Sequence, residues 1–424
     1  MSWGRRFRRR QYLRSSLWVW PVVGGVVGAV VAPLVVKIDH HISMPAFWSS
    51  SPSTASTVLA TIVGAAAALT GFVVTVSVLV VQMATGTFSA RYMRVWYRDP
   101  MLKAVLALLV GIIAFSLTIL RRVSTTFVPN LGVVLDGLFV LASLVLFLLF
   151  LDRFIHRLRP VAVASIAATQ VRETFAAAED ALTLGVGTPP TPTDGEVATV
   201  TTTEAGAIQA VHVRGLLLWA ERRQSRVVLR HAVGDFVPSD VLLLEVHGRL
   251  EPGDADRLRD MVALGDERTV EQDPAFAIRI MVDVAIRALS AAVNDPTTAV
   301  QVLDYLEDVL RHVGARDHGP WAEARLADGR VGLVVPTRSW DDYLALSVTE
   351  IREYGARSIQ VMRRLRALLE GLRSSVRAEL VAAVDNEIAR LDATVAASFG
   401  DAVDHDRARR GDRQGIGGPA GVGG

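Results

Sequence analysis

The segment TVLATIVGAAAALTGFVVTVSVLVVQMA, residues 57–84, contains no charged side chain. A helix needs roughly 20 apolar residues to cross the hydrocarbon core of a bilayer, and this stretch is longer than that. Three further apolar runs occupy residues 17–36, 104–120 and 131–151. The sequence therefore predicts an α-helical membrane protein with four transmembrane helices within residues 17–151, surrounded by a lipid bilayer.

Small and hydroxyl residues of this stretch fall on one narrow stripe of the predicted helix, because successive residues turn by about 100°. The stripe comprises Thr57, Thr61, Gly64, Ala68, Gly71, Thr75, Leu79, Gln82 and Gly86. Such residues allow helices to pack closely in lipid. In a homo-oligomer, residues Thr61 to Gln82 of the stripe would instead line a pore, with Leu79 as a constriction that excludes water. Both interpretations remain open.

Asp136 is an acidic residue inside the fourth predicted span. Ionisable groups within spans usually face protein or water, which makes Asp136 a candidate functional residue. It stands near the start of its span, so pairing with Arg121 or Arg122 of the preceding loop is an equally good explanation. In the first span, Gly24 and Gly28 form a GxxxG pair, a spacing that favours helix packing.

The basic residues are distributed unevenly between the predicted loops. They gather in residues 5–14, 91–103 and 153–159, whereas the alternate loops contain Lys37, Arg121 and Arg122. Cytoplasmic loops carry the excess of Lys and Arg, so we expect cytoplasmic N- and C-termini in a multi-pass plasma-membrane protein. The net charge of +2 gives no reason to expect a nucleic-acid partner.

The composition removes several kinds of chemistry. The chain has no cysteine, which excludes thiolate metal sites and a cysteine nucleophile. Lys37 and Lys103 are its lysines, so the rest of the chain cannot supply a Schiff-base or phosphate-loop lysine. Adjacent Asp39, His40 and His41 have metal-ligating side chains, but histidines in a loop are usually solvated. We expect no enzyme activity, no cofactor and no metal.

Residues beyond 151 have the composition of a mixed globular domain. We predict a connecting helix and linker over 152–199 with a break near Pro160, a β-rich module over 200–249, a helical cytoplasmic domain over 250–410, and a disordered tail over 411–424. GDFVPSD (234–240) followed by LLLEV resembles the small barrels of biotinyl and lipoyl domains. No lysine stands at the hairpin tip, so the resemblance predicts a barrel or sandwich shape only.

The stretch VDVAIRALSAAVNDPTTAVQVLDYLEDVL, residues 282–310, predicts two helices joined by a polar corner. Asp295 suits the N-cap of the second helix, Pro296 its first position, and Asn294 a left-handed exit from the first. Upstream, Arg279 and Asp283 share one face with Arg287, and the surplus arginine needs an acid such as Glu271 or Asp273, or an anion. Ser290 completes a corner that is either structural or anion-binding.

Four blocks of the sequence resemble the bacterial predicted membrane proteins grouped as domain of unknown function 2254. They are FSARYMRVWYRDP (88–100), GDFVPSD (234–240), the run from Ala263 to Leu310, and the run from Trp340 to Leu365. Ala90 and Ala291 stand where that family usually has proline. The resemblance covers nearly the whole chain, and it implies four spans and a cytoplasmic domain but no activity.

Two different functions are consistent with these features of the sequence. The first is an oligomeric channel or transporter-like pore with a cytoplasmic regulatory domain, suggested by the stripe and by Asp136. The second is a membrane-anchored scaffold or sensor whose cytoplasmic domain binds a partner or a small anionic ligand. The sequence contains no HExxH motif, phosphate loop or nucleophile elbow that would favour an enzyme.

Overall fold

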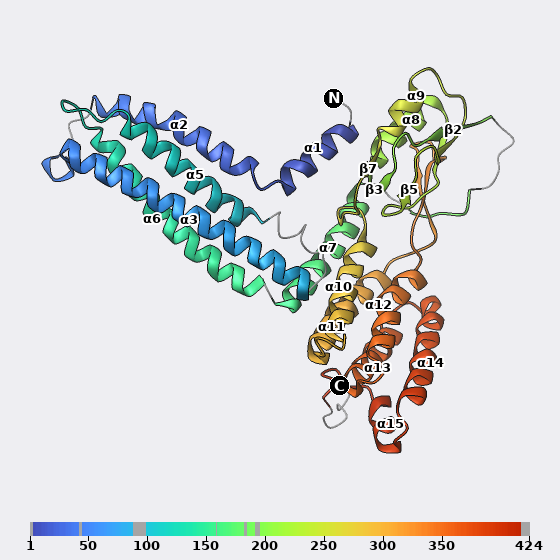
Figure 1. The fold of residues 1–424 in the computed structure, drawn as a ribbon. Helices are drawn as coiled ribbons and strands as arrows, with labels where there is room; N and C mark the ends of the chain where they lie inside the picture. Colours follow the sequence, from blue (N-terminus) through green and yellow to red (C-terminus); the bar gives the residue numbers. More distant parts are fainter. Residues whose placement is uncertain are drawn as a thin grey trace. The chain divides into compact units, whose positions relative to one another are not determined.

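The computed structural model describes residues 3–41, 45–87, 99–157, 159–181, 185–190 and 196–416. It forms two compact units (Figure 1). One is Arg10–Arg159, called here the helical unit. The other combines Met1–Arg9 with Pro160–Gly424 and is called the C-terminal unit. Helix α1 (Trp3–Ser15) contributes to both.

The helical unit contains four helices that are long and apolar enough to cross a membrane. They are α2 (Val19–Asp39), α3 (Pro52–Thr87), α5 (Pro100–Leu120) and α6 (Asn130–Arg157), with a short 3-10 turn η1 (Ala46–Trp48) before α3. Helix α5 is the most buried of the four, because α2, α3 and α6 all pack on it. The prediction of four apolar helices is confirmed.

Glycines bring α2 and α5 into backbone contact. A Cβ atom added at Gly24 would clash with the backbone of Ala107, and one at Gly28 with the backbone of Gly111. The contact is reciprocal, since a Cβ at Gly111 would lie 3.1 Å from the carbonyl oxygen of Gly24. The predicted role of the GxxxG pair in helix packing is therefore confirmed.

The C-terminal unit contains a six-stranded sheet of order β1-β8-β9-β4-β6-β2 and a three-stranded sheet of order β5-β3-β7. Strands β4 and β9 pair in parallel, and the other neighbours are antiparallel. The strands are β1 (Gly185–Val186), β2 (Val197–Thr201), β3 (Gly206–Val211), β4 (Arg226–Leu229), β5 (Phe236–Val237), β6 (Leu242–His247), β7 (Val262–Gly265), β8 (Trp321–Arg325) and β9 (Val331–Pro336).

The predicted barrel over residues 200–249 is wrong, because the described residues form no closed barrel. Two distant strands, β8 and β9, complete the larger sheet beside β4. Residues 207–220 of the predicted β-rich module are also not all strand, since β3 is followed by α8 (Val213–Arg223). Leu216, Leu217 and Ala220 recur at helical spacing and are buried, which explains why this segment is a helix.

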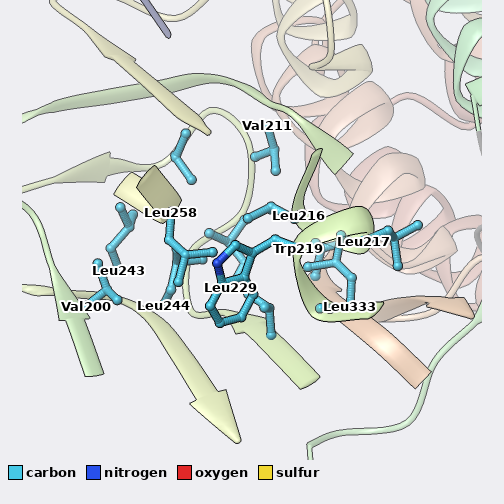
Figure 2. Close-up of a cluster of buried hydrophobic side chains, with 14 of the residues drawn as sticks. Val200, Val211, Leu216, Leu217, Trp219, Leu229, Leu243, Leu244, Leu258 and Leu333 are labelled. Atoms are coloured by element: carbon cyan, nitrogen blue, oxygen red, sulfur yellow. The ribbon is translucent and has the colours of Figure 1, made fainter. Parts of the chain in front are cut away.

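The core of the sheet region is a cluster of buried aliphatic side chains around Trp219 (Figure 2). Leu216 and Trp219 of α8 meet Leu229 of β4 and Leu244 of β6 in this cluster. Each fully buried leucine contributes about 1.5–3 kcal/mol relative to exposure. The indole Nε1 of Trp219 donates a hydrogen bond to the buried carboxylate of Asp254 at 3.3 Å, so its polar atom is also satisfied.

Helices make up the rest of the C-terminal unit. They are α7 (Pro160–Ala181), α9 (Asp254–Arg259), α10 (Pro274–Ala288), α11 (Pro296–Gly314), α12 (Trp340–Tyr354), α13 (Ile359–Arg373), a 3-10 turn η3 (Ala378–Leu380), α14 (Val381–Ser398) and α15 (Ala402–Arg409). The predicted break near Pro160 is confirmed. Residues 250–410 are not all helical, because β7, β8 and β9 lie among them.

Two predicted irregular segments contain ordered contacts. Gly185 and Val186, at the start of the predicted linker, pair with β8. In the predicted tail, the backbone N–H of Asp412 donates to the carbonyl of Arg363 on α13 at 3.2 Å. Residues 191–195 and 417–424 lie outside the described residues.

Helix α1 attaches the start of the chain to the C-terminal unit. The ring of Trp3 stacks on His212 with centroids 4.8 Å apart and planes inclined by 3°. The N–H of Gly4 donates to the carbonyl of Asp260 at 3.0 Å, and Arg8 pairs with Glu204 at 2.7 Å. Stacking, a backbone hydrogen bond and an ion pair therefore hold residues 3–8 on this unit.

Candidate functional site

The predicted stripe lies on the outward face of α3 within the helical unit. From Thr57 to Gln82 every member of the stripe is exposed, and Leu79 is 53% exposed. The opposite face packs inside the unit through Ala55, Leu59 and Val73. A Cβ atom added at Gly64 or Gly71 would meet no atom within 4 Å. Between Thr57 and Leu79 the stripe therefore faces away from the packed interior of the helical unit.

The stripe differs in chemistry from the other exposed faces of the helical unit. The exposed side chains of α2 and α6 are mainly valine and leucine, such as Val26, Leu141 and Leu148, which suit contact with lipid. On α3 the exposed stripe carries hydroxyl groups and glycines. Thr75 donates its hydroxyl hydrogen to the carbonyl of Gly71 at 2.9 Å, so its oxygen still has a free lone pair to accept from water.

Asp136 is fully buried between helices of the helical unit. Ser116 of α5 donates its hydroxyl hydrogen to the Asp136 carboxylate of α6 at 2.6 Å. The proposed partners Arg121 and Arg122 are exposed at the end of α5. Among the side chains that the structure describes, the partner of Asp136 is thus a serine, and the contact joins α5 to α6.

Polar groups in the corner at residues 287–298 form hydrogen bonds with one another. Asp295 caps α11 by accepting from the N–H and hydroxyl of Thr298 at 3.1 and 2.5 Å. Asn294 has a φ of 47°, in the left-handed region, and Ser290 donates to the carbonyl of Arg287 at 2.7 Å. The predicted helix–corner–helix joint is confirmed, and Arg287 and Ala291 are exposed on it. Ala90 lies outside the described residues.

The charged face of α10 is completed by α12. Arg279 donates to Asp283 at 2.7 Å and also to both carboxylate oxygens of Glu350. The predicted partners Glu271 and Asp273 are therefore wrong, because Glu350, which is distant in sequence, reaches this face. Two acids already neutralise Arg279, so the position of this arginine requires no bound anion.

A cavity of about 430 Å³ lies in the C-terminal unit, and the sequence did not predict it. Its walls come from α7, both sheets, the start of α10 and the start of α12. The lining residues are Thr174, Phe175, Val211, Val213, Leu229, Ala232, Val233, Glu271, Gln272, Asp273, Pro274, Ala275, Val335, Pro336, Thr337, Arg338 and Tyr343. Pockets of this size hold small organic ligands.

Three polar groups define the chemistry of this cavity. Asp273, 2% exposed, caps α10 by accepting from Phe276 N–H at 3.0 Å and pairs with Arg268 at 2.7 Å. Burial raises the pKa of Tyr343 and the charge of Asp273 raises it further, so the hydroxyl stays neutral. The charge of Arg338, which lines the same cavity, opposes both effects. Convergent polar groups with perturbed pKa values in an apolar pocket are typical of binding sites.

The local sequence contained one usable signal for this cavity. Asp273-Pro274 starts α10 in the same way that Asp295-Pro296 starts α11, so a helix N-terminus was predictable there. Tertiary folding brings Phe175, Leu229 and Arg338 together at the start of this helix. They are far apart in the sequence, so no local pattern predicts that they meet.

No group of three or more His, Asp or Glu side chains is arranged to hold a metal ion in the described part of the chain. Around the Asp39-His40-His41 segment, Asp39 accepts from the N–H of Leu131 at 3.1 Å and His40 stacks on Phe127 at 4.1 Å. The Nδ1 of His41 lies 2.8 Å from the carbonyl oxygen of Lys37, so all three side chains make structural contacts within the helical unit.

Comparison with known proteins assigns the chain to a family. The family model "Predicted membrane protein (DUF2254)" matches residues 14–371. The chain belongs to this family. Together with its four apolar helices, this membership makes the DUF2254 chain a membrane protein.

Mycobacterial proteins are among the relatives of this DUF2254 chain. Uncharacterized protein MT1328 of Mycobacterium tuberculosis (strain CDC 1551 / Oshkosh) is 29% identical over 379 residues, covering 85% of this chain and 72% of the relative. Uncharacterized protein Mb1321c of Mycobacterium bovis has the same identity and coverage. No solved structure matches the chain.

Proposed function

We propose that this DUF2254 protein is a homo-oligomeric channel or transporter-like pore of the bacterial plasma membrane, with a regulatory C-terminal unit. The observation that carries the proposal is the exposed stripe of α3. On α3, Gly64, Gly71 and Thr75 are exposed. The exposed residues of α2 and α6 are instead mainly valine and leucine. Copies that meet through α3 would remove this face from lipid and surround a polar path.

In this proposal the stripe has two chemical parts. Thr57, Thr61 and Thr75 offer hydroxyl oxygens to water along the path, and Leu79 forms an apolar ring that closes it by dewetting. The stripe carries no charged side chain, so the barrier would come from the apolar ring rather than from fixed charge. The excess of basic residues in alternate loops supports a cytoplasmic N-terminus and a cytoplasmic C-terminal unit in this proposal.

The decisive experiment measures ion flux through the purified protein in liposomes. We expect Leu79→Ser to raise the flux above wild type by at least about tenfold, since a hydroxyl in place of an isobutyl group keeps the constriction wet. Leu141→Ser is the matched control, because Leu141 is 61% exposed on α6, outside the stripe. This control should leave the flux unchanged.

The proposal of a pore is wrong if Leu79→Ser and wild type show equally low ion flux while both remain oligomeric. It fails also if Leu141→Ser leaks as much as Leu79→Ser, because the leak would then follow from any serine on the lipid face. Variants at Thr75 provide a second readout, since enlarging this side chain should lower the flux of the open Leu79→Ser protein.

A second function is favoured by a different observation. The cavity of about 430 Å³ in the C-terminal unit has the size and lining of a ligand site. A membrane-anchored sensor would use this cavity without conducting ions. Absence of flux together with ligand binding to the C-terminal unit would support the sensor and exclude the pore.

A further inference from the structure

The cavity of the C-terminal unit is built to hold a molecule with an apolar body. Phe175 of α7, Val211 of β3 and Leu229 of β4 line it, and Val211 and Leu229 belong to the buried cluster that Figure 2 shows. An apolar wall that is continuous with the core is rigid, since its residues are fixed by packing on their other sides. A ligand would therefore meet a largely preformed surface.

Two side chains of the cavity have hydrogen-bonding capacity that the protein leaves unused. Tyr343 is 5% exposed, and its hydroxyl has no hydrogen-bond partner among the described residues. Arg338, whose side chain is 35% exposed, makes one long ion pair, 3.7 Å from Asp235. A group that accepts hydrogen bonds from both would use this capacity.

The buried carboxylate of Asp273 is already engaged. Both of its oxygens accept hydrogen bonds, one from Phe276 N–H and the other from Arg268. Glu271 also interacts within the protein, although its buried Oε2 accepts no hydrogen bond from the described residues. The donors that remain available are a guanidinium with several N–H groups and a neutral phenol, and both can donate to an anion.

We propose that this cavity binds a small apolar molecule with one carboxylate, which accepts hydrogen bonds from Arg338 and Tyr343 while its body lies against Phe175 and Leu229. Arginine matches a carboxylate because its planar fork can donate two parallel hydrogen bonds. The inference rests on the sensing role of the C-terminal unit, and it holds whether or not that unit controls a pore.

The experiment compares three probes that differ in their head group. Phenylacetate, phenethyl alcohol and phenethylamine are titrated by calorimetry into the full chain in lipid nanodiscs, with empty nanodiscs as the blank. We expect phenylacetate to bind in the micromolar to millimolar range, and at least about tenfold more tightly than the alcohol or the amine.

Four variants locate the binding. Arg338→Gln should weaken phenylacetate binding at least about tenfold and remove the preference for the acid over the alcohol. Tyr343→Phe should weaken it severalfold, and Val233→Trp should abolish it by filling the cavity. Arg257→Gln is the matched control for the loss of an arginine, because Arg257 is 74% exposed and lies outside the cavity.

Several results would overturn the proposal. Equal affinity for the three probes, preference for the amine, or no binding of phenylacetate at millimolar concentration would each do so. An unchanged affinity in both Arg338→Gln and Tyr343→Phe would also overturn it. The ion-flux experiment addresses α3 and does not depend on these variants, so failure of the pore and failure of the binding site are distinguishable.

Discussion

His318 packs against two residues that line the cavity, and we expect it to make the C-terminal unit sensitive to acid. Its ring packs edge-on against Phe175 and Tyr343, with centroids 5.5 and 5.7 Å away, and its Nε2 donates to the carbonyl of Val313 at 2.8 Å. Burial lowers the pKa of His318 from its ordinary value of 6.5, and the nearby charge of Arg316 also lowers it, against the opposing effect of the Val313 hydrogen bond. The native state therefore favours the neutral imidazole more strongly than the unfolded chain does.

This lowered pKa predicts lower stability in acid. As the pH falls below 6.5, His318 becomes protonated in the unfolded chain but stays neutral in the native state, because its native pKa is lower. The free energy of unfolding therefore decreases with falling pH until the pH passes the native pKa. One proton accounts for at most about 1.4 kcal/mol per pH unit. We expect His318→Gln to be less stable at neutral pH but to lose less stability between about pH 7 and pH 5.

Circular dichroism melting of wild type and His318→Gln across this range measures the effect. The lowered pKa values of His212 and His247 add their own acid sensitivity, so the variant should retain part of the slope. Parallel melting curves for the two proteins at every pH would contradict the prediction, since they would show that His318 takes up its proton equally in both states.

Glycines of α2 and α3 have opposite roles, although both lie in apolar helices. Gly28 contacts the backbone of α5, whereas Gly64 faces open space in the single chain. We expect Gly28→Leu to destabilise the helical unit by about 1–3 kcal/mol or more, because α2 must move away from α5. Gly64→Leu should change the stability of the monomer by less than about 0.5 kcal/mol.

Thermal unfolding of both variants, each purified as a monomer in detergent, tests this difference. A large loss in Gly64→Leu under these conditions would mean that another element of the same chain packs on the stripe. If Gly28→Leu melted like wild type, the close approach of α2 and α5 would be refuted.

Helices were predictable from the sequence where neighbouring residues alone determine them. Length and hydropathy predicted the four apolar helices, and Asp295-Pro296 predicted the start of α11 correctly. The sheet was not predictable in the same way, because β4 pairs with β9 although seven helices and strands, β5, β6, α9, β7, α10, α11 and β8, lie between them in the sequence. The partner of Arg279 was missed for the same reason, since Glu350 reaches α10 only through the packing of α12. The cavity depends on such distant contacts in every wall.

At the scale of the whole molecule, the proposed assembly can be tested because the chain has no cysteine. Thr75→Cys on the stripe should form a disulfide between two copies in the membrane under mild oxidation. Leu141→Cys, on the exposed face of α6, should remain monomeric on a non-reducing gel. Efficient cross-linking of Leu141→Cys would mean that copies meet through α6 rather than through the stripe. No cross-linking of Thr75→Cys would exclude a contact between copies at this position.

The attachment of α1 has a consequence for how the protein is made. Arg8 and Glu204 are separated by 196 residues, so the ribosome synthesises all four apolar helices before the docking surface of α1 exists. Until then the arginine-rich helix has no partner at Glu204 and Asp260. The docked N-terminus is consequently a late event in biogenesis, and it can form only in chains whose two segments have remained on the same side of the membrane.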